Sequence, residues 1–339
     1  MKNMEPITTQ AVPVATGVGA ETTSKSKTEQ FYDDVMMGLN STPKRLNSKY
    51  FYDANGDKLF QALMNCEEYY PTKCELEIFS GKTAEICDAI IGAGDAFDLI
   101  ELGAGDAYKS TYLLRYLIDK QVDFTYLPID ISENVISYLN IALPVTLPGL
   151  QVTGLNGEYF EMLEKAASIS NKRKVVMFLG SNIGNMLVCE AEGFCRELRN
   201  NLSPGDLLLI GFDLKKNPKT VLAAYNDRDG ITKNFNLNLL ERINRELEGN
   251  FDLSRFDHYP IYDPETGACR SYLVSLCDQK VKIKNDAVHF LKDEVIYMEI
   301  SQKFTISQID QIAIKASFKP VNHFFDSKHW FSDVIWMAE

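Results

Sequence analysis

The sequence predicts an α/β fold in which a doubly wound parallel sheet is joined to a second, smaller α+β domain. Three observations support this fold class. Short apolar strands alternate with amphipathic helices over residues 96–214, a glycine turn follows the first strand, and the alternation ends after residue 215. Strand–helix–strand crossovers are almost always right-handed and join parallel strands, so the alternating part should form one sheet with helices on both faces.

The elements before the alternating part are expected to be helical. Residues 27–40 place apolar side chains at helical spacing, and residues 57–66 do so again after a turn predicted at the Asn-Gly pair, 55–56. Pro71 is expected to break the chain. A single helix is then predicted over residues 74–94.

The alternating part supplies five predicted strands, with a helix after each of the first four. The segments that contain the strands are 96–102, 123–132, 150–160, 174–186 and 205–214. The first helix ends near residue 118, and the next three are expected at 133–143, 161–168 and 192–202. Each strand segment is short and mainly apolar, which is typical of strands buried on both faces.

The remaining elements complete the two units. They are, in order, a helical stretch at 220–247, strands at 268–277 and 294–304, a helix at 307–317, and strands at 318–325 and 331–339. The last three are expected to add a helix and an antiparallel edge to the first sheet. The predicted division is therefore a core of 78–214 plus 305–339 and a second domain of 27–77 plus 215–304.

The glycine turn IELGAGD lies where doubly wound folds bind ligands, at the carboxyl end of the first strand. Gly103 and Gly105 match the dinucleotide-binding pattern G-x-G-x-x-G, but Tyr108 occupies the third glycine position. Glu101 precedes the glycines and Asp106 follows them. These carboxylates favour a ligand with an ammonium group over one with two phosphates, and S-adenosylmethionine is such a ligand.

Asp130 ends the second strand about 25 residues after the glycines, where its carboxylate could accept hydrogen bonds from ribose hydroxyls. Two alternatives remain open at this point. A nicotinamide dehydrogenase would also use this turn, although the missing third glycine counts against it, and a plain strand–helix turn would bind nothing. Lys109 begins the first helix and is equally compatible with a solvated position.

Composition narrows the partners and the compartment. The formal charge is −12 without a basic stripe, so a small substrate is expected as partner, and nucleic acid and anionic membranes are not. The seven cysteines form no CxxC pair and the four histidines lack metal-ligand spacing, which predicts a reducing cytoplasm and no metal site. The basic loop 215–219 is expected to be solvated. Residues 1–26 are polar and proline-interrupted, so a disordered tail without a signal peptide is predicted.

The whole sequence resembles the L-histidine Nα-methyltransferases of ergothioneine biosynthesis and their fungal relatives that methylate prenylated tryptophan. The matching blocks follow the family order past the tail: FYDANGDKLF, EEYYPTKCELEI, IELGAGDAYKS, PIDIS, FLGSNIGN, LLLIGFDLKKNP, VLAAYND, FNLNLLERINREL and MEISQKF. The resemblance implies a class I methyltransferase core that uses S-adenosyl-L-methionine as its cofactor. It also implies that the second domain binds the substrate.

Carried over position by position, the resemblance implies two adjoining sites. The cofactor site would contain Gly103, Lys109, Asp130 and Glu158, of which Glu158 stands in a Gly-Glu-Tyr context where the family often has Gly-Asp-Phe. The amino-acid site would contain seven residues: Tyr52, Tyr69, Gly180, Asn185, Tyr225, Glu299 and Ser301.

Glu299 and Ser301 are two residues apart in a predicted strand, so their side chains share one face, opposite Met298 and Ile300. By the resemblance, the Glu299 carboxylate would accept a ring N–H of histidine and the Ser301 hydroxyl would serve the other ring nitrogen. Relatives that act on indole substrates have no need of such a pair. Its presence therefore favours histidine.

The implied reaction is methyl transfer to the α-amino group of L-histidine, up to trimethylation, which forms hercynine. Asn185 and Tyr225 would hold the substrate carboxylate. Tyr52 and Asn185 are the expected catalytic residues. No strong base stands among the matched residues, so either the amine proton leaves through Tyr52 and water or a minor neutral population of the amine binds. The alternatives are a tryptophan-like or other aromatic amine substrate, and a non-catalytic protein that binds cofactor and amino acid. A monomer is expected.

Overall fold

The computed structural model describes residues 26–92 and 96–339. The predicted disordered tail, 1–26, lies outside the described residues apart from Ser26. This residue caps helix α1 (Lys27–Leu39): its hydroxyl accepts the Glu29 N–H, and the Glu29 carboxylate accepts the Ser26 N–H. This reciprocal capping box satisfies backbone donors that the first turn of a helix leaves unpaired.

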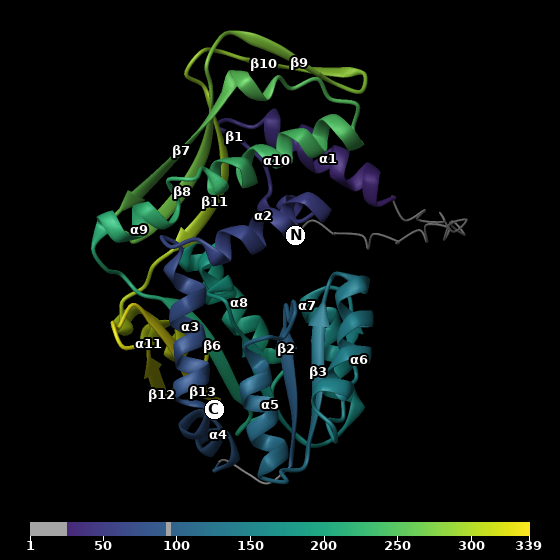
Figure 1. Cartoon of the computed structure of the whole chain (residues 1–339), viewed down its shortest axis with the longest axis vertical. Coiled ribbons are helices and arrows are strands. Elements are labelled where there is room, and N and C mark those ends of the chain that lie inside the picture. The colour runs from purple at the N-terminus through teal and green to yellow at the C-terminus, as the bar shows by residue number, and fades with distance from the viewer. Residues whose placement is uncertain (1–25, 93–95) are drawn as a thin grey trace, which may run out of the picture.

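A seven-stranded sheet forms the centre of the molecule (Figure 1). Its strands lie in the order β12-β13-β6-β5-β2-β3-β4. Strands β2 to β6 pair in parallel, whereas β13 is antiparallel to both β6 and β12. The bounds are β2 (Phe97–Leu102), β3 (Phe124–Asp130), β4 (Leu155–Asn156), β5 (Arg173–Phe178), β6 (Leu207–Asp213), β12 (Phe318–Phe325) and β13 (Phe331–Ala338). The predicted doubly wound sheet with an antiparallel edge is confirmed.

Helices cover both faces of this sheet (Figure 1). Successive strand residues point to opposite faces, so Leu99 packs into one apolar cluster and Ile100 into the other. The first face is covered by α3 (Tyr70–Gly81), α4 (Thr83–Ile91), α5 (Ser110–Asp119) and α6 (Glu133–Thr146). The second face is covered by α7 (Tyr159–Ile169), α8 (Val188–Asn200) and α11 (Ile306–Lys315).

A second unit lies beyond the carboxyl ends of the parallel strands, in the upper part of Figure 1. It has a four-stranded sheet in the order β1-β11-β8-β7 and a β9–β10 hairpin. The strand bounds are β1 (Lys44–Arg45), β7 (Phe256–Asp263), β8 (Ala268–Ser275), β9 (Gln279–Ile283), β10 (Asp286–Phe290) and β11 (Val295–Gln302). A third apolar cluster joins these strands to α1, α2 (Ala54–Asn65) and α10 (Ile231–Glu246). The short elements are α9 (Pro218–Ala224), η1 (Ser48–Phe51), η2 (Asn182–Asn185) and η3 (Leu253–Arg255).

The two sheets meet at the end of β11. The Phe304 N–H donates to the Asp213 carbonyl at 3.0 Å, and the Lys215 N–H donates to the Phe304 carbonyl at 2.8 Å. β11 therefore carries its polar face directly to the carboxyl end of β6. The predicted domain boundary at residues 77 and 78 falls inside α3, which packs on the seven-stranded sheet, and the domain division stays a prediction.

The turn predicted at the Asn-Gly pair, 55–56, is wrong. These residues form the first turn of α2, because the Asp53 carboxylate accepts the Gly56 N–H at 2.7 Å and caps the helix. An aspartate in this position stabilises a helix start. The close approach of Gly56 to the Phe51 carbonyl leaves no room for a side chain, which explains why a glycine stands inside the helix.

Two predicted long helices are each divided in the structure. The helix expected over 74–94 is α3 followed by α4, with the break at Lys82. Pro71 does not break the chain but lies in the first turn of α3, a position at which a helix tolerates proline well. The stretch 220–247 is α9 followed by α10, with Gly230 in the left-handed region at φ 68° before α10. Apolar spacing continues past the break at Lys82, so the pattern did not indicate it. The second break coincides with the polar run 225–230, which ends in Gly230, a local turn signal that the prediction overlooked.

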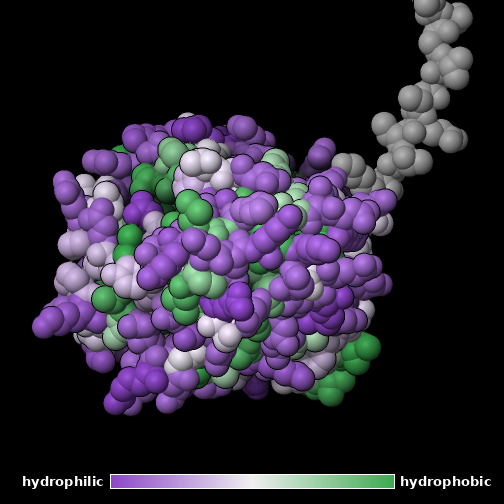
Figure 2. Space-filling view, turned by 90° about the horizontal axis from the view of Figure 1, so that it is seen from above, coloured by the Kyte–Doolittle hydropathy of each residue, from purple (hydrophilic) through white to green (hydrophobic). Residues whose placement is uncertain are grey.

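The face of the molecule seen from above is mainly polar, with apolar residues in smaller separate areas (Figure 2). Among the residues that the structure describes, no helix is both long and apolar enough to span a bilayer.

Candidate active site

The candidate site lies where the carboxyl ends of the parallel strands meet β11, the position at which doubly wound folds bind ligands. The ends of these strands carry four of the predicted residues: Gly103, Asp130, Glu158 and Gly180. β11 carries Glu299 and Ser301. The loop after β5 packs so tightly on β11 that a Cβ on Gly184 would lie 2.9 Å from the Gln302 carbonyl oxygen.

The glycine turn after β2 adopts a backbone conformation that favours glycine. Gly103 has φ 71° and Gly105 has φ 54°. A Cβ on Gly103 would lie 2.8 Å from the Tyr159 hydroxyl and 3.7 Å from Asn182 Nδ2, so a larger residue would displace these groups. The Gly105 N–H donates to the Asp130 carboxylate at 3.1 Å, which fixes the turn to the end of β3.

Two carboxylates lie beside this turn. Asp130 accepts the Ser132 N–H with Oδ1, at 2.9 Å, and the Gly105 N–H with Oδ2. Glu158 is exposed at the start of α7. Burial, followed by the charges of Asp130 and Glu158, raises the pKa of Tyr159 to about 12, so both carboxylates lie near this phenol. Each carboxylate oxygen has spare acceptor capacity, which suits ribose hydroxyls and an adenine amino group.

Lys109 lies at the same edge of the sheet and pairs with Glu75, which is fully buried. Burial alone would lower the pKa of Lys109, but the Glu75 charge raises it above its usual value. The other Glu75 oxygen accepts the Gly180 N–H at 2.7 Å. Burial and then the Glu75 charge raise the pKa of the neighbouring Asp333. Glu75, which the sequence did not indicate, thus connects a predicted cofactor residue, Lys109, with a predicted substrate residue, Gly180.

Glu101 is engaged within the protein, contrary to the expectation that it faces a ligand. Its carboxyl oxygens accept hydrogen bonds from the Ser110 hydroxyl at 2.7 Å and from the Tyr126 hydroxyl. The side chain is 4% exposed, and burial raises its pKa to about 7. Glu101 therefore binds the first residue of α5, Ser110, and holds the start of this helix against β2.

β11 presents Glu299 and Ser301 on one face, while its apolar residues pack into the second unit, as the alternation predicts. Burial raises the pKa of Glu299 to about 7, opposed by the hydrogen bond from Asn236, at 3.4 Å, and by the charge of Lys303. At neutral pH this carboxyl group is present in both protonation states. It can therefore either accept a ring hydrogen bond or donate one.

A buried lysine that the sequence analysis did not single out lies behind these side chains. Lys303 is 0% exposed, and its ammonium contacts three oxygen atoms: Asp213 Oδ2 at 2.6 Å, Ser301 Oγ at 2.7 Å and Tyr225 Oη at 2.7 Å. The Tyr225 and Ser301 hydroxyls also share a hydrogen bond at 2.6 Å. The sequence could have indicated Lys303, because the two-residue period of a strand that places Glu299 and Ser301 on one face also places Lys303 there.

Lys216, in the loop 215–219 that was expected to be solvated, is buried instead. It pairs with Asp213, and the Tyr70 hydroxyl donates to the same carboxylate at 2.8 Å. Burial alone would raise the pKa of Asp213, but the charges of Lys303 and Lys216 hold it below its usual value. Two lysines around one aspartate leave a net positive charge behind the two hydroxyl groups.

The remaining predicted substrate residues lie around the same junction. The rings of Tyr69 and Tyr225 meet edge to face with their centroids 6.2 Å apart. Although Tyr52 is 47% exposed, burial, followed by the charge of Glu299 and by Tyr159, raises its pKa. Tyr52 therefore lies near both the β11 pair and the glycine turn. Asn185, at the end of η2, has an exposed side chain.

Asn182 is a second residue that the sequence did not indicate. Its side-chain amide lies 3.7 Å from the Cβ position of Gly103 and 3.6 Å from that of Gly180. It therefore spans the gap between the cofactor turn and the loop after β5. A polar residue within the block FLGSNIGN was the only local sign of this role, and such residues are common in turns.

This combination defines the class of protein. A doubly wound sheet with an antiparallel last strand, a glycine turn after β2 and an acidic residue at the end of β3 form the core of a class I S-adenosylmethionine-dependent methyltransferase. The sequence model of a family described as "Histidine-specific methyltransferase, SAM-dependent" matches residues 31–338. The chain belongs to this family, and the resemblance drawn from its motifs is confirmed.

Individual relatives support the same assignment. The chain is 33% identical to a "Histidine N-alpha-methyltransferase" of Mycolicibacterium smegmatis over 91% of this chain and 92% of that protein. It is 34% identical to a protein of the same name from Mycobacterium tuberculosis, over 80% and 83% of the two chains. An "L-tryptophan methyltransferase trpM" of Psilocybe serbica is 26% identical over 87% and 89%.

Proposed function

We propose that this enzyme transfers methyl groups from S-adenosylmethionine to the α-amino group of L-histidine, up to the trimethylated product, hercynine. The observation that carries the proposal is the pairing of Glu299 with Ser301 at the junction of the two sheets. A carboxyl group with a pKa of about 7 can match either form of an imidazole nitrogen. An indole ring has only one nitrogen, so one member of the pair would remain unpaired.

The cofactor would lie along the glycine turn. Gly103 allows the backbone to approach its methionine part, and Lys109, shared with Glu75, would meet its carboxylate. Asp130 would accept hydrogen bonds from the ribose hydroxyls and Glu158 one from the adenine amino group. The hydrogen bond from Gly105 to Asp130 keeps that carboxylate aligned with the turn.

The substrate would occupy the space between this turn and β11. Asn185 and the Tyr225 hydroxyl would donate hydrogen bonds to its carboxylate, and Glu299 and Ser301 would hold the ring. Gly180 and Tyr69 would line the space between the head group and the ring. A site with such partners rejects ligands that leave a buried polar group unpaired, often by several orders of magnitude.

Methyl transfer is an in-line displacement. The amine lone pair forms the new nitrogen–carbon bond while the carbon–sulfur bond breaks, and its electron pair remains on sulfur, giving S-adenosylhomocysteine. The raised pKa of Tyr52 keeps its phenol protonated, so this group cannot begin as an ionised base. Its oxygen would instead accept a hydrogen bond from the amine and orient the lone pair, while the proton passes to water. Such positioning contributes up to roughly 7–11 kcal/mol.

Turnover of histidine and of its mono- and dimethyl derivatives, followed by mass spectrometry, tests the proposal. We expect stepwise conversion of all three to the trimethyl product and much slower turnover of tryptophan. If the protein binds S-adenosylhomocysteine but converts none of the histidine species, the assignment to histidine is wrong. Turnover of tryptophan alone would indicate an indole substrate, and no turnover of any amine would indicate a non-catalytic binding protein.

We also propose that the enzyme acts as a monomer in the cytoplasm. All seven cysteines are free thiols, which suits a reducing compartment. Light scattering after size-exclusion chromatography tests the oligomeric state, and a mass of twice the chain would contradict it.

A further inference from the structure

The hydrogen bonds of Lys303 restrict what the neighbouring hydroxyl groups can offer to a ligand. An ammonium group has three donors and no acceptor. Lys303 directs them at Asp213, Ser301 and Tyr225, all within 2.7 Å, and its side chain is fully buried. Both hydroxyl oxygens must therefore accept a hydrogen bond from Lys303.

The two hydroxyls also share one hydrogen bond with each other, at 2.6 Å. Each hydroxyl has a single hydrogen, so one of the two hydrogens is used within the pair. If Tyr225 donates to Ser301, then Ser301 has a free O–H and Tyr225 a free lone pair. If Ser301 donates instead, the free groups are exchanged. The pair therefore offers one donor and one acceptor to a ligand, and never two donors.

We propose that Lys303 is a positioning residue that couples recognition of the substrate ring to recognition of the substrate carboxylate. This inference rests on the proposed function, in which the carboxylate takes the Tyr225 O–H. Ser301 must then donate to Tyr225 and accept a ring N–H. Glu299 serves the second ring nitrogen. A ligand without the ring N–H leaves the Ser301 lone pair unpaired. A ligand without the carboxylate does not favour the arrangement in which Ser301 donates to Tyr225.

Lys303→Met tests the coupling, because it removes the three donors with little change in side-chain length. Asp213 keeps an ion pair with Lys216 and a hydrogen bond from Tyr70, so its charge is not left uncompensated. Four ligands are compared by calorimetry in the presence of S-adenosylhomocysteine: histidine, histamine, phenylalanine and phenethylamine. Histidine has both the ring nitrogens and the carboxylate. Histamine has only the ring nitrogens, phenylalanine has only the carboxylate, and phenethylamine has neither.

In the wild-type protein we expect the ring and carboxylate to contribute cooperatively to affinity. K303M should weaken histidine binding at least tenfold, while the other three ligands and S-adenosylhomocysteine change less than threefold. Lys216→Met is the matched control, since it removes an equal charge from the same carboxylate, and within the described residues no hydrogen bond joins Lys216 to either hydroxyl. K216M should leave histidine affinity within threefold of wild type.

Three results would overturn the inference: an equal loss for all four ligands, a parallel loss of S-adenosylhomocysteine binding, or the same effect from K216M. If K303M does not fold, the single variants Tyr225→Phe and Ser301→Ala are compared with their combination. Their effects on histidine affinity should depart from additivity at least fivefold, and additivity contradicts the coupling. Failure of the wild-type protein to bind histidine would instead refute the proposed function.

Discussion

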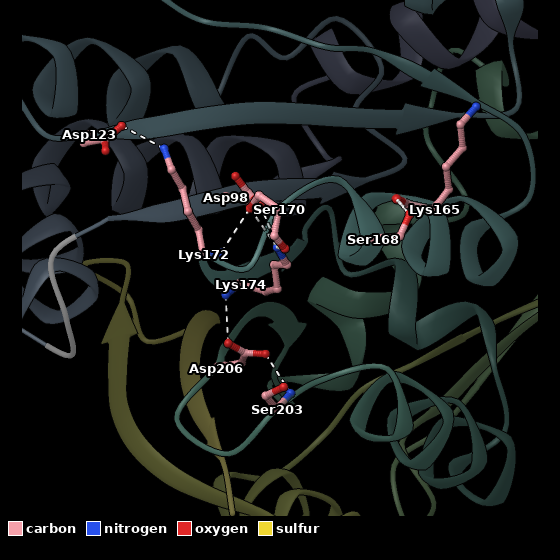
Figure 3. A network of polar contacts seen from close by, with 9 residues as sticks. All are labelled: Asp98, Asp123, Lys165, Ser168, Ser170, Lys172, Lys174, Ser203 and Asp206. Atoms are coloured by element: carbon pink, nitrogen blue, oxygen red, sulfur yellow. Dashed lines mark hydrogen bonds and ion pairs between the residues drawn. The ribbon is translucent and has the colours of Figure 1, made fainter.

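Both ends of the seven-stranded sheet bury a lysine–aspartate pair, but the two lysines direct their remaining donors to different partners. At the amino ends of β2 and β5, Lys174 Nζ lies 2.7 Å from Asp98, and its other contacts are the carbonyl and hydroxyl of Ser170, at 2.8 and 3.2 Å (Figure 3). At the carboxyl ends, Lys303 also has three partners, but two of them are side-chain hydroxyls with spare bonding capacity. Both lysines are buried, and each is paired with a buried aspartate.

The comparison shows which feature separates a structural ion pair from one that acts on a ligand. At the amino ends, the network closes on itself, because the Ser170 hydroxyl donates to Asp98 at 2.5 Å and Asp206 accepts backbone N–H groups of Lys174 and Ser203 (Figure 3). Such a network fixes a loop, because the lysine ammonium and the serine hydroxyl direct their hydrogens to other members of the network. A buried charged residue therefore indicates a ligand site only when the groups that it contacts can still form hydrogen bonds to a ligand.

The largest expected effect comes from breaking the structural pair. Asp98→Ala leaves Lys174 as an unpaired buried charge, so we expect the free energy of unfolding to fall by about 3–5 kcal/mol. Urea unfolding monitored by circular dichroism measures this loss. The kcat/KM of the folded variant should stay near wild type, because the pair lies at the opposite end of the sheet.

The matched control replaces the whole pair by apolar residues, with Asp98→Leu and Lys174→Met combined. Buried ion pairs are often replaced in this way at little cost, so most of the lost stability should return. Reduced activity of Asp98→Ala at unchanged stability would contradict the assignment of this end as structural.

A second effect concerns the other buried acid of β2. Glu101 is hydrogen-bonded to two hydroxyls, and its pKa of about 7 exceeds the value of 4.5 expected in the unfolded chain. The folded state therefore binds more protons between these values, and stability falls as pH rises from about 4.5 to 7, by up to about 3 kcal/mol. Glu101→Gln should lack this contribution. Urea unfolding at several pH values between 5 and 8 measures the difference, and parallel curves for the two proteins would refute it.

The sequence predicted the architecture because the signals for it are local. Strands β2 and β3 are apolar runs bounded by turns, and parallel strands bring their carboxyl ends to one edge, so Gly103 and Asp130 could be placed together. Lys303 was not predicted, although the period of two places it beside Ser301, because the aspartate that neutralises its charge lies far away in the sequence. Only the contact between β11 and β6 brings these charges together. The break at Lys82 was missed because apolar spacing continues past it, whereas the break before α10 had a local signal in Gly230 that the prediction overlooked.

The Glu299 side chain allows a test of the functional end of the sheet. Glu299→Ala removes a hydrogen bond to a ligand ring, so histidine affinity should fall about 10–100-fold. The affinity for S-adenosylhomocysteine should change less than threefold. Calorimetric titration of each ligand measures both, and an equal loss of the two would mean that Glu299 does not contact the substrate.

The pH dependence of histidine affinity gives a finer test of the same side chain. Glu299 has a pKa of about 7 and a free imidazole one near 6.5, so the complex is expected to hold one proton between them. Affinity should peak near neutral pH, falling below it as both groups become protonated and above it as both lose their protons. Glu299→Gln should retain only the fall at acid pH. A variant profile that keeps its alkaline fall would contradict proton sharing.

The smallest effect is expected at the rim of the structural network. Lys172 Nζ lies 2.8 Å from Asp123, but these side chains are 29% and 69% exposed, unlike the buried Lys174–Asp98 pair (Figure 3). Water and dissolved salt screen an exposed pair, so Lys172→Ala should lower the free energy of unfolding by less than about 1 kcal/mol, and by less still at high salt. Urea unfolding of K172A and Asp98→Ala side by side measures the contrast. Equal losses would show that burial does not set the strength of these pairs, which would remove the basis for comparing the two ends of the sheet.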